Sequence, residues 1–364
     1  MFKFIHAADF HLDSAFGALP PLQAAQRRRE SRELGRRLAG YVRDHAIDAV
    51  LLAGDLFDSR EAYRETGEEL AAAFAEMPAL VFISPGNHDW YGPDTPWAKV
   101  DWPRNVILFR EDRMTAVEVP QWNAVFHGAA FLGPERQEGF LRGFRAPQDG
   151  RIHIGVLHGD VEGGGRYAPI SREDIEQCGL HYLALGHIHK RLEPKRLGST
   201  LFAWPGCIEG RGFDELGEKG FYEGTVADDG GVTVEFVPFA RHRYESIRVD
   251  VTGKDPREAI RAALPQGTEE DLYRITLTGT TGENGLDVGA LREELAPGFY
   301  DLELRDQTRL EEDLWHRARE DSLRGLFLRA LLAQRQAADS EETRQRIDRA
   351  ARYGLAALDH RDLG

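Results

Sequence analysis

Short apolar runs, each followed at once by polar or charged residues, recur along the first part of the chain. Runs over residues 2–8, 48–53 and 79–85 alternate with helical patterns over residues 22–45 and 61–77. Apolar runs of this length, bounded by turn residues, are typical of buried strands. Because strands that alternate with helices usually form parallel sheets, this part of the chain is predicted to be of the α/β class.

After residue 105 the pattern changes to short strands separated by turns. Such strands occur over residues 106–109, 115–119 and 124–129, and they predict a second sheet. Further strands are predicted over residues 151–157, 182–185, 200–206 and 221–238. Residues 1–245 are therefore predicted to form one domain that is built on two sheets.

The last third of the chain is predicted to fold apart from this first domain. Strands and helices alternate over residues 248–251, 256–264, 272–277, 287–295 and 299–304, which predicts a small α+β layer over residues 246–308. In residues 309–364 one helix face carries Leu323, Leu326, Phe327, Ala330 and Leu331, and another helix starts near Ser340. This helical tail either packs on its own chain or docks a partner.

Composition narrows the class of protein and its compartment. The chain of 364 residues has 41% hydrophobic and 29% charged residues, as ordinary globular proteins do. We find no apolar run long enough for a transmembrane helix and no signal-peptide pattern. The two cysteines, Cys178 and Cys207, lie in no CxxC motif, which argues against a zinc-thiolate site. We therefore expect a cytoplasmic protein that does not bind a membrane.

The net charge of −15 bears on the choice of substrate. A strongly acidic protein binds polyanions poorly unless its basic residues are clustered. The predicted helix over residues 22–45 is such a cluster, because Arg28, Arg32 and Arg36 are among its arginines. This helix is either a solvated surface or a stripe that contacts DNA phosphates.

Residues that can bind metal ions follow five of the predicted strands. The segments are Asp9-Phe10-His11, Gly54-Asp55-Leu56-Phe57-Asp58, Gly86-Asn87-His88-Asp89, His158 and Gly186-His187-Ile188-His189. Each segment taken alone is more often a turn or an exposed loop than a site. Ligands in open α/β sheets, however, collect at the carboxyl ends of the strands. Five strand ends of the same kind therefore indicate one shared site.

The potential ligands offer only oxygen and nitrogen atoms. They are Asp9, His11, Asp55, Asn87, His158, His187 and His189. Such a set favours Mn²⁺, Fe or Zn²⁺, and it suits two ions bridged by Asp55, the arrangement used for phosphoryl transfer. His88 is left over and is suited to protonate the leaving oxygen. Asp58 either orients a histidine or caps the next helix.

In this order the five segments resemble the five motifs of calcineurin-like metallophosphoesterases. The resemblance implies a two-sheet βαβ sandwich with two divalent metal ions between the sheets, Mn²⁺ first and Fe, Zn²⁺ or Mg²⁺ as alternatives. One ion would be bound by Asp9, His11 and His189 and the other by Asn87, His158 and His187, with Asp55 as the bridge and His88 as the catalytic histidine. Asp58 and Asp89 would hold these ligands in place through hydrogen bonds.

Within this family, the segment Ile5-His6-Ala7-Ala8-Asp9-Phe10-His11-Leu12-Asp13-Ser14 resembles the SbcD-type DNA repair exonucleases, and their YhaO-like branch in particular. This resemblance implies cleavage of single- or double-stranded DNA, with residues 246–308 as a capping domain. It also implies that the C-terminal helices dock on an SMC-type, SbcC-like ATPase. A contact between two copies of the tail, in a homodimer, is the alternative.

Three classes of function stay open at this point. The first is a metal-dependent DNA nuclease that works with a partner. The second is a phosphodiesterase or phosphatase that acts on small molecules or proteins, and the third is a non-catalytic scaffold. The complete ligand set, with His88 present, disfavours the scaffold. The predicted cap and tail favour the nuclease, whereas the net charge favours the second class.

Overall fold

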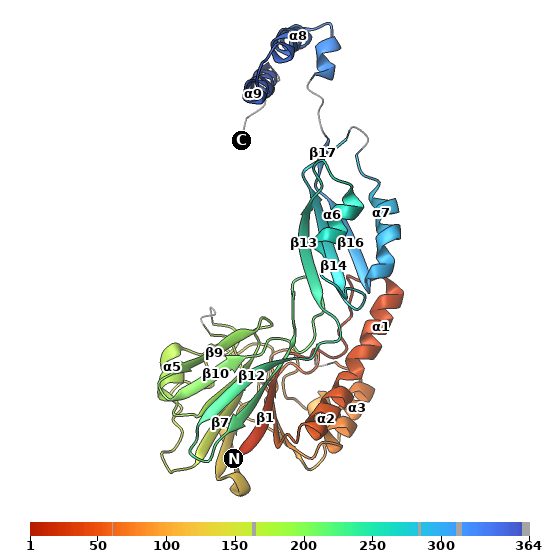
Figure 1. Cartoon of the computed structure of the whole chain (residues 1–364). Helices are drawn as coiled ribbons and strands as arrows, with labels where there is room; N and C mark the ends of the chain where they lie inside the picture. Colours follow the sequence, from red (N-terminus) through yellow and green to blue (C-terminus); the bar gives the residue numbers. More distant parts are fainter. Residues whose placement is uncertain (60, 162–164, 283–284, 311–314, 359–364) are drawn as a thin grey trace. The chain divides into compact units, whose positions relative to one another are not determined.

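A computed structural model of the chain describes residues 1–59, 61–161, 165–282, 285–310 and 315–358 (Figure 1). Contacts within the chain define two units. The first consists of Met1–Ser246, Gly267–Arg274 and Pro297–Leu302, and the second contains the rest. The domain boundaries at residues 245 and 308 stay predictions. The last six residues of the predicted tail lie outside the described residues.

The first sheet has six strands in the order β12-β11-β1-β2-β3-β4. Their bounds are β1 (Phe2–Ala7), β2 (Ala49–Leu52), β3 (Leu80–Ile83), β4 (Val106–Leu108), β11 (Gly220–Val226) and β12 (Val232–Pro238). Strands β1 to β4 are parallel, whereas β11 and β12 pair antiparallel to their neighbours. The prediction that residues 106–109 belong to a second sheet is wrong, because β4 pairs with β3.

The second sheet also has six strands, in the order β5-β6-β7-β8-β10-β9. Their bounds are β5 (Thr115–Val119), β6 (Ala124–Gly128), β7 (Ile152–His158), β8 (Tyr182–Gly186), β9 (Leu192–Leu197) and β10 (Thr200–Trp204). The central strands β6, β7, β8 and β10 are parallel, and the edge strands β5 and β9 are antiparallel to their neighbours. The predicted two-sheet α/β architecture is therefore confirmed.

Helices connect the strands of the first unit. They are α1 (Pro21–Arg32), α2 (Leu34–Asp44), α3 (Arg64–Ala75), α4 (Pro96–Lys99) and α5 (Arg172–Gln177). The prediction of one helix over residues 22–45 is wrong at Glu33, which separates α1 from α2. There the Glu33 amide lies closer to the carbonyl of Glu30 (3.1 Å) than to that of Arg29 (3.3 Å), so the turn is tightened.

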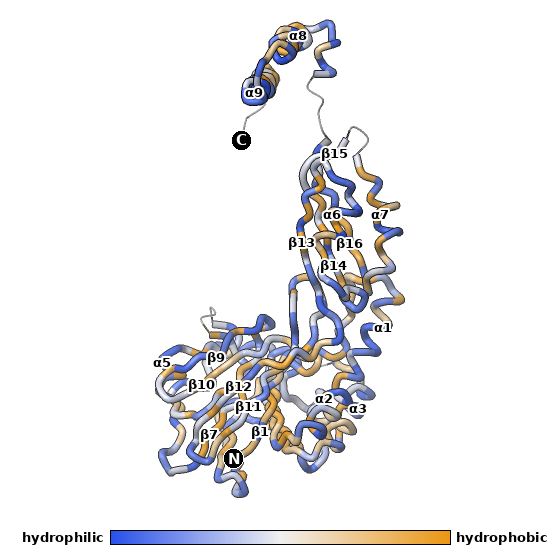
Figure 2. The backbone as a smooth tube through the Cα atoms, viewed as in Figure 1, coloured by the Kyte–Doolittle hydropathy of each residue, from blue (hydrophilic) through white to orange (hydrophobic). Residues whose placement is uncertain are grey.

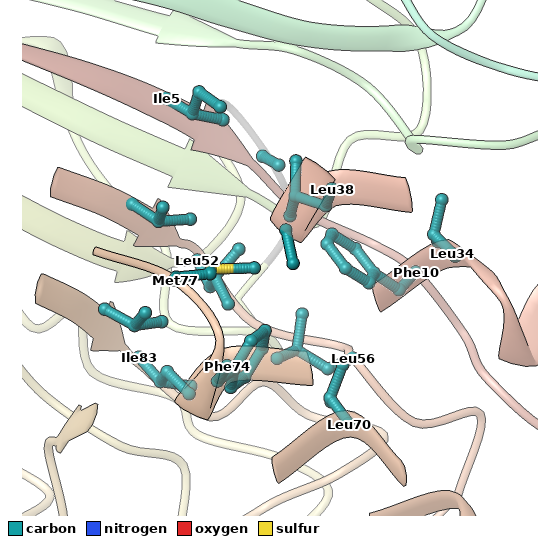
Figure 3. Packing of buried hydrophobic residues seen from close by; sticks show 14 of the residues in the cluster. Ile5, Phe10, Leu34, Leu38, Leu52, Leu56, Leu70, Phe74, Met77 and Ile83 are labelled. Atoms are coloured by element: carbon teal, nitrogen blue, oxygen red, sulfur yellow. The ribbon is translucent and has the colours of Figure 1, made fainter. Parts of the chain in front are cut away.

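Alternating side chains of the strands fill two separate apolar layers. Ile5 of β1 packs with Leu38 of α2 and Phe74 of α3 on the helix side of the first sheet (Figure 3). Phe4, its neighbour in β1, points to the other face and packs with Tyr182 of β8, between the two sheets. This period of two is expected for a strand buried on both faces, and β1 is accordingly mostly hydrophobic in Figure 2.

His6 is a buried polar link between the two sheets. It lies in β1, and its Nε2 donates to the carbonyl of Leu185 (3.1 Å), so its Nδ1 accepts from the hydroxyl of Tyr182 (2.8 Å). Both partners belong to β8. The link therefore fixes β1 against β8 just before the segments that carry Asp9 and His187.

The buried position of His6 predicts a loss of stability in acid. Burial lowers its pKa to about 3, from 6.5. Below pH 6.5 His6 is protonated in the unfolded chain, whereas in the folded chain it stays neutral until about pH 3. Between these two pH values the free energy of unfolding should therefore fall, by up to about 1.4 kcal/mol per pH unit. Urea unfolding between pH 7 and pH 5 should show a shallower fall for His6→Gln. Parallel curves for the two proteins would contradict this.

The small α+β layer matches its sequence pattern. A three-stranded sheet in the order β13-β14-β16 is accompanied by two helices. The bounds are β13 (Tyr244–Asp250), α6 (Pro256–Ala263), β14 (Leu272–Thr278), α7 (Val288–Leu295) and β16 (Asp301–Asp306). A short parallel pair, β15 (Thr280–Thr281) with β17 (Arg309–Leu310), follows.

The C-terminal segment is helical, as predicted. Helices α8 (Leu323–Gln336) and α9 (Glu341–Leu358) pack together through Leu328, Ala351 and Leu355. The predicted apolar stripe is split by this packing, because Phe327 and Leu331 contact the shared core whereas Leu323 and Leu326 are 69% and 59% exposed. In the described parts of the chain, no helix is long and apolar enough to cross a membrane.

Candidate metal centre

The five predicted segments meet at one place in the first unit. Strands β1, β2 and β3 are neighbours in the first sheet, and β7 and β8 are neighbours in the second. Each strand ends within one of the segments or is separated from it by one or two residues, so the segments lie at the carboxyl ends of these strands. All seven predicted ligands lie close to at least one other member of the set.

The backbone of these segments is held in an uncommon conformation. Asp9 (φ 55°), His11 (φ 45°) and Asp55 (φ 51°) are left-handed although none is glycine. Hydrogen bonds hold them there, because the amides of Asp9 and His11 each donate over 3.0 Å to the carbonyls of Gly54 and Asp55. Backbone strain of this kind is kept where the surrounding structure fixes it, most often at functional sites.

Two glycines of the motifs are required by close approach. A Cβ atom on Gly86 would lie 2.2 Å from Oδ1 of Asp55, and one on Gly186 would lie 1.9 Å from the carbonyl oxygen of Ala53. Backbone atoms cannot shift easily, so any side chain at these positions would push the ligand segments apart.

The first group consists of Asp9, His11 and His189, one candidate set of metal ligands. Nε2 of His11 lies 3.1 Å from Nε2 of His189, and Nε2 of His189 lies 3.8 Å from Oδ1 of Asp9. Nδ1 of His189 donates to Oε1 of Glu215 over 2.7 Å. Because that proton is on Nδ1, Nε2 is the atom that can bind a cation.

The second group consists of Asn87, His158 and His187. The amide oxygen of Asn87 lies 3.0 Å from Nε2 of His158 and 3.1 Å from Nδ1 of His187. Nδ1 of His158 lies 2.8 Å from the carbonyl oxygen of Ala53 and must donate to it. This leaves Nε2 of His158 directed at Asn87 and available to a cation.

Asp55 lies between the two groups, as a bridging ligand must. Its Oδ2 is 3.3 Å from Nε2 of His158 and 3.8 Å from Nε2 of His11. Its Oδ1 accepts from the amide of His88 over 2.9 Å, which fixes the carboxylate plane. The side chain of Asp55 is 2% exposed, so its charge must be balanced locally.

The electrostatics of the site favour a cation beside Asp55. Burial acts to raise the pKa of Asp55, but the imidazoles of His158 and His11 outweigh it and hold this pKa well below its usual range. Burial acts to lower the pKa of His158, but Asp55 raises it to about 9. A buried positive charge on Nε2 of His158 thus balances Asp55, at the position where a metal ion would take over this role.

Asp58 and Asp89 both lie beside the segments that carry the predicted ligands. Oδ1 of Asp58 is 3.2 Å from Nδ1 of His11. The alternative that Asp58 caps the next helix is wrong, because α3 begins after Tyr63. The buried carboxylate of Asp89 accepts from the amides of Gly86 (2.7 Å) and Leu56 (2.8 Å), so it joins the Asp55 segment to the Asn87 segment. Their effect on metal binding stays a prediction.

His88 lies at the rim of the site and differs from the other histidines. Its side chain is exposed, and its Nδ1 donates to the carbonyl of Asp58 over 3.1 Å. Nε2 is therefore left to contact a substrate. A pocket of about 420 Å³ opens here, and its lining includes Asn87, His88, Trp90 and Tyr167. His88 also forms a candidate metal group with His11 and Asp58, so a ligand role is the alternative.

Sequence reasoning missed two charged residues of the site. Arg211 donates to Asp58 over 2.9 Å and to Glu215 over 2.8 Å, and Glu215 accepts from His189. Burial acts to raise the pKa of Glu215, but the contacts with His189 and Arg211 hold it well below its usual range. Both residues follow β10, so the signal was a sixth strand end with charged residues after it.

The arginines of the predicted helix separate into two sets. Arg28, Arg32 and Arg36 line one surface pocket of about 400 Å³, together with Glu33 and others. Arg27, by contrast, is fully buried and forms ion pairs with Glu30 (3.2 Å) and Glu209 (3.0 Å). The prediction of a solvated helix surface is therefore wrong for Arg27. For Arg28, Arg32 and Arg36, a solvated surface and a stripe that contacts DNA phosphates both stay open.

The fold and the strand-end site define a class of protein. Residues 2–191 match the family described as calcineurin-like phosphoesterase, and this match covers more than half of the chain. The chain therefore belongs to the calcineurin-like phosphoesterases, a family of metal-dependent hydrolases. The donor set fits that chemistry, since the described candidate groups offer only oxygen and imidazole nitrogen atoms.

Two curated proteins are similar over most of the chain. The uncharacterized metallophosphoesterase YhaO of Bacillus subtilis is 33% identical over 264 residues, which is 68% of this chain and 63% of that protein. The DNA double-strand break repair protein Mre11 of Methanopyrus kandleri is 24% identical over 342 residues, which is 85% of this chain and 72% of that protein. The aligned part thus spans somewhat less than two thirds of the first relative.

Proposed function

We propose that this protein is a phosphodiesterase that uses two divalent metal ions, with Mn²⁺ as the most effective ion, to cleave DNA during DNA repair. The observation that carries the proposal is the position of Asp55, whose buried carboxylate lies between the imidazoles of His11 and His158. Asp9, His11 and His189 would hold one ion, and Asn87, His158 and His187 the other. Paired ions polarise a phosphoryl group and activate water.

The chain's own residues have three tasks in this mechanism. Glu215 orients His189 through a hydrogen bond, Asp58 lies 3.2 Å from Nδ1 of His11, and Arg211 donates to both carboxylates. His88, fixed through its Nδ1, presents Nε2 to the leaving oxygen and gives it a proton. The two sheets keep water away from the inner side of the ligand groups, since Asp9 and Asp55 are almost fully buried.

Two observations favour DNA over a small phosphate ester. Trp90 and Tyr167 line the pocket beside His88, and aromatic side chains of this kind stack on bases in single-stranded nucleic acids. The similarity to a DNA double-strand break repair protein extends over 85% of the chain. The acidic net charge supports the second candidate, a phosphodiesterase or phosphatase for small-molecule or protein substrates.

One assay distinguishes the two candidates. The protein and Mn²⁺ are incubated with end-labelled linear single- and double-stranded DNA and, in parallel, with bis-p-nitrophenyl phosphate. Cleavage of both substrates supports the proposal. Hydrolysis of the small ester alone, with intact DNA at the same protein concentration, would assign the protein to the second candidate.

The surface arginines are predicted to contribute to DNA binding only. The triple variant Arg28→Glu, Arg32→Glu and Arg36→Glu removes three cations around one pocket. Each arginine that no longer neutralises a phosphate should reduce the slope of log K against log salt by about one, so the slope should fall by up to about three. Fluorescence anisotropy at several salt concentrations measures this slope.

Hydrolysis of bis-p-nitrophenyl phosphate by the triple variant should be unchanged, because none of the three arginines lines the pocket beside His88. As a matched control, Arg104→Glu, Arg110→Glu and Arg142→Glu change the net charge by the same amount. If both triple variants alter the slope equally, the effect is one of net charge and the arginine pocket has no special role.

We propose that the tail docks the SMC-type ATPase partner through the exposed side chains of α8. Leu323 and Leu326 stay exposed although α8 and α9 pack together, and apolar side chains left in water are typical of interfaces. Truncation after residue 310 keeps β17 and removes both helices. The truncated protein should keep its secondary structure, metal content and activity on the small ester.

A pull-down with the SMC-type ATPase of the same organism tests the partner. Leu323→Asp with Leu326→Asp should lose the interaction, whereas Gln334→Asp, which changes an exposed residue of the same helix, should keep it. Full binding by the truncated chain would exclude docking through the tail. A loss of dimer mass in the double variant, without any loss of the ATPase, would favour the homodimer.

A further inference from the structure

A second pocket of the first unit lies apart from the pocket beside His88. Its volume is about 490 Å³, within the range of about 300–1,000 Å³ that is typical of small-ligand sites. The apolar wall includes Ile175 of α5, Leu192 and Leu197 of β9, and Phe202 and Trp204 of β10. These three elements are labelled at the edge of the second sheet in Figure 1.

The rim of the pocket is cationic. Arg172, Lys195 and Arg196 line it, and no acidic residue is among the described residues of the lining. Arg196 is partly engaged, since its Nη1 donates to the carbonyl of Ser199 over 2.7 Å. Three cations around an apolar wall select for an anionic group attached to an apolar body.

We propose that this pocket binds a small amphipathic anion, such as a medium-chain carboxylate. The apolar body lies against Leu192, Phe202 and Trp204, and the anionic group faces the cationic rim. A peptide strand that adds to the edge of the sheet is the less suitable occupant. The edge strand β9 contains Pro194, which has no amide N–H to donate to an added strand.

The pocket is connected to the metal centre through the chain. Ile188, which lines it, lies between the predicted ligands His187 and His189. Val161, which also lines it, lies three residues after the predicted ligand His158. An occupant that shifts Ile188 therefore shifts both neighbouring imidazoles, which makes the pocket a regulatory site for the metal centre. This coupling rests on the proposed function, whereas binding of the anion does not.

The binding experiment uses the full chain and 8-anilinonaphthalene-1-sulfonate, a fluorescent probe with an apolar body and one anionic group. Decanoate should displace the probe, and decanol should displace it at least about tenfold less well. Arg172→Glu with Lys195→Glu should weaken the probe's binding about tenfold or more. The matched control, Arg104→Glu with Lys254→Glu, reverses two exposed cations elsewhere and should change it less than about twofold.

Equal binding of the probe by the wild type and the Arg172→Glu, Lys195→Glu variant would overturn the site. Equal displacement by decanoate and decanol would overturn the choice of an anion.

Coupling to the metal centre is measured separately. Saturating decanoate should change the Kd for Mn²⁺ at least about threefold in calorimetric titration of the metal-free protein. An unchanged Kd, with decanoate bound, would overturn the regulatory role. If Mn²⁺ does not bind at all, the proposed function fails, and the displacement data still decide whether the pocket is a site.

Discussion

An Asp55→Asn variant should lose both metal ions together, with an affinity for Mn²⁺ at least about 100-fold weaker than that of the wild type. Loss of a group that only supports a ligand already costs about 10–100-fold, and Asp55 is expected to contact both ions directly. Its Oδ2 lies 3.3 Å from His158 and 3.8 Å from His11. Elemental analysis of the Mn²⁺-loaded, gel-filtered protein counts the ions per chain.

Asparagine is the right substitution because it keeps the shape of the side chain. Its oxygen can still accept from the amide of His88, so the fold should be preserved. Asp149→Asn is a matched control, since Asp149 also contacts a histidine, His153, but lies outside the site. A variant that loses one ion and keeps the other would show that Asp55 binds a single metal and is not a bridge.

The layout of the fold was predictable where the signal is local. Buried strands such as β1 and β7 are short apolar runs, and the polar residues that end them are adjacent in sequence. The sheet to which a strand belongs is a non-local property. In its sequence pattern β4 resembles the strands β5 and β6 that follow it. It nevertheless pairs with β3, because the chain adds β4 to the first sheet before it continues into the second sheet with β5.

The candidate site was predictable from its ligands but not from its supports. Glycine before Asp55, Asn87 and His187 marks a place where a neighbouring segment approaches the backbone closely, and this pattern is visible in a single sequence. Arg211 also follows a glycine, Gly210, but Arg211 and Glu215 lie several residues beyond the end of β10 at Trp204. They act through contacts with Asp58 and His189 that only the folded chain brings about. Arg27 was misjudged for the same reason, since its partner Glu209 is distant in sequence.

The last prediction concerns His88. An His88→Asn variant should cleave DNA about 10²–10⁴-fold more slowly, which is the usual contribution of a general acid, and should keep its metal ions. The structure gives the reason: Nδ1 of His88 is fixed on the carbonyl of Asp58, and the side chain is exposed at the pocket rim, outside the buried ligand groups. Single-turnover cleavage of labelled DNA, with elemental analysis of the same sample, measures both quantities.

The choice of leaving group separates proton donation from every other role. A sugar hydroxyl must be protonated as it leaves, whereas p-nitrophenolate is a stable anion and needs no proton. The loss should therefore be large for DNA and much smaller for bis-p-nitrophenyl phosphate. His45→Asn, which removes an exposed imidazole outside the site, should affect neither substrate. An equal loss of activity on both substrates, with intact metal content, would show that His88 binds the phosphate instead. A loss of metal would show that His88 is a metal ligand together with His11 and Asp58.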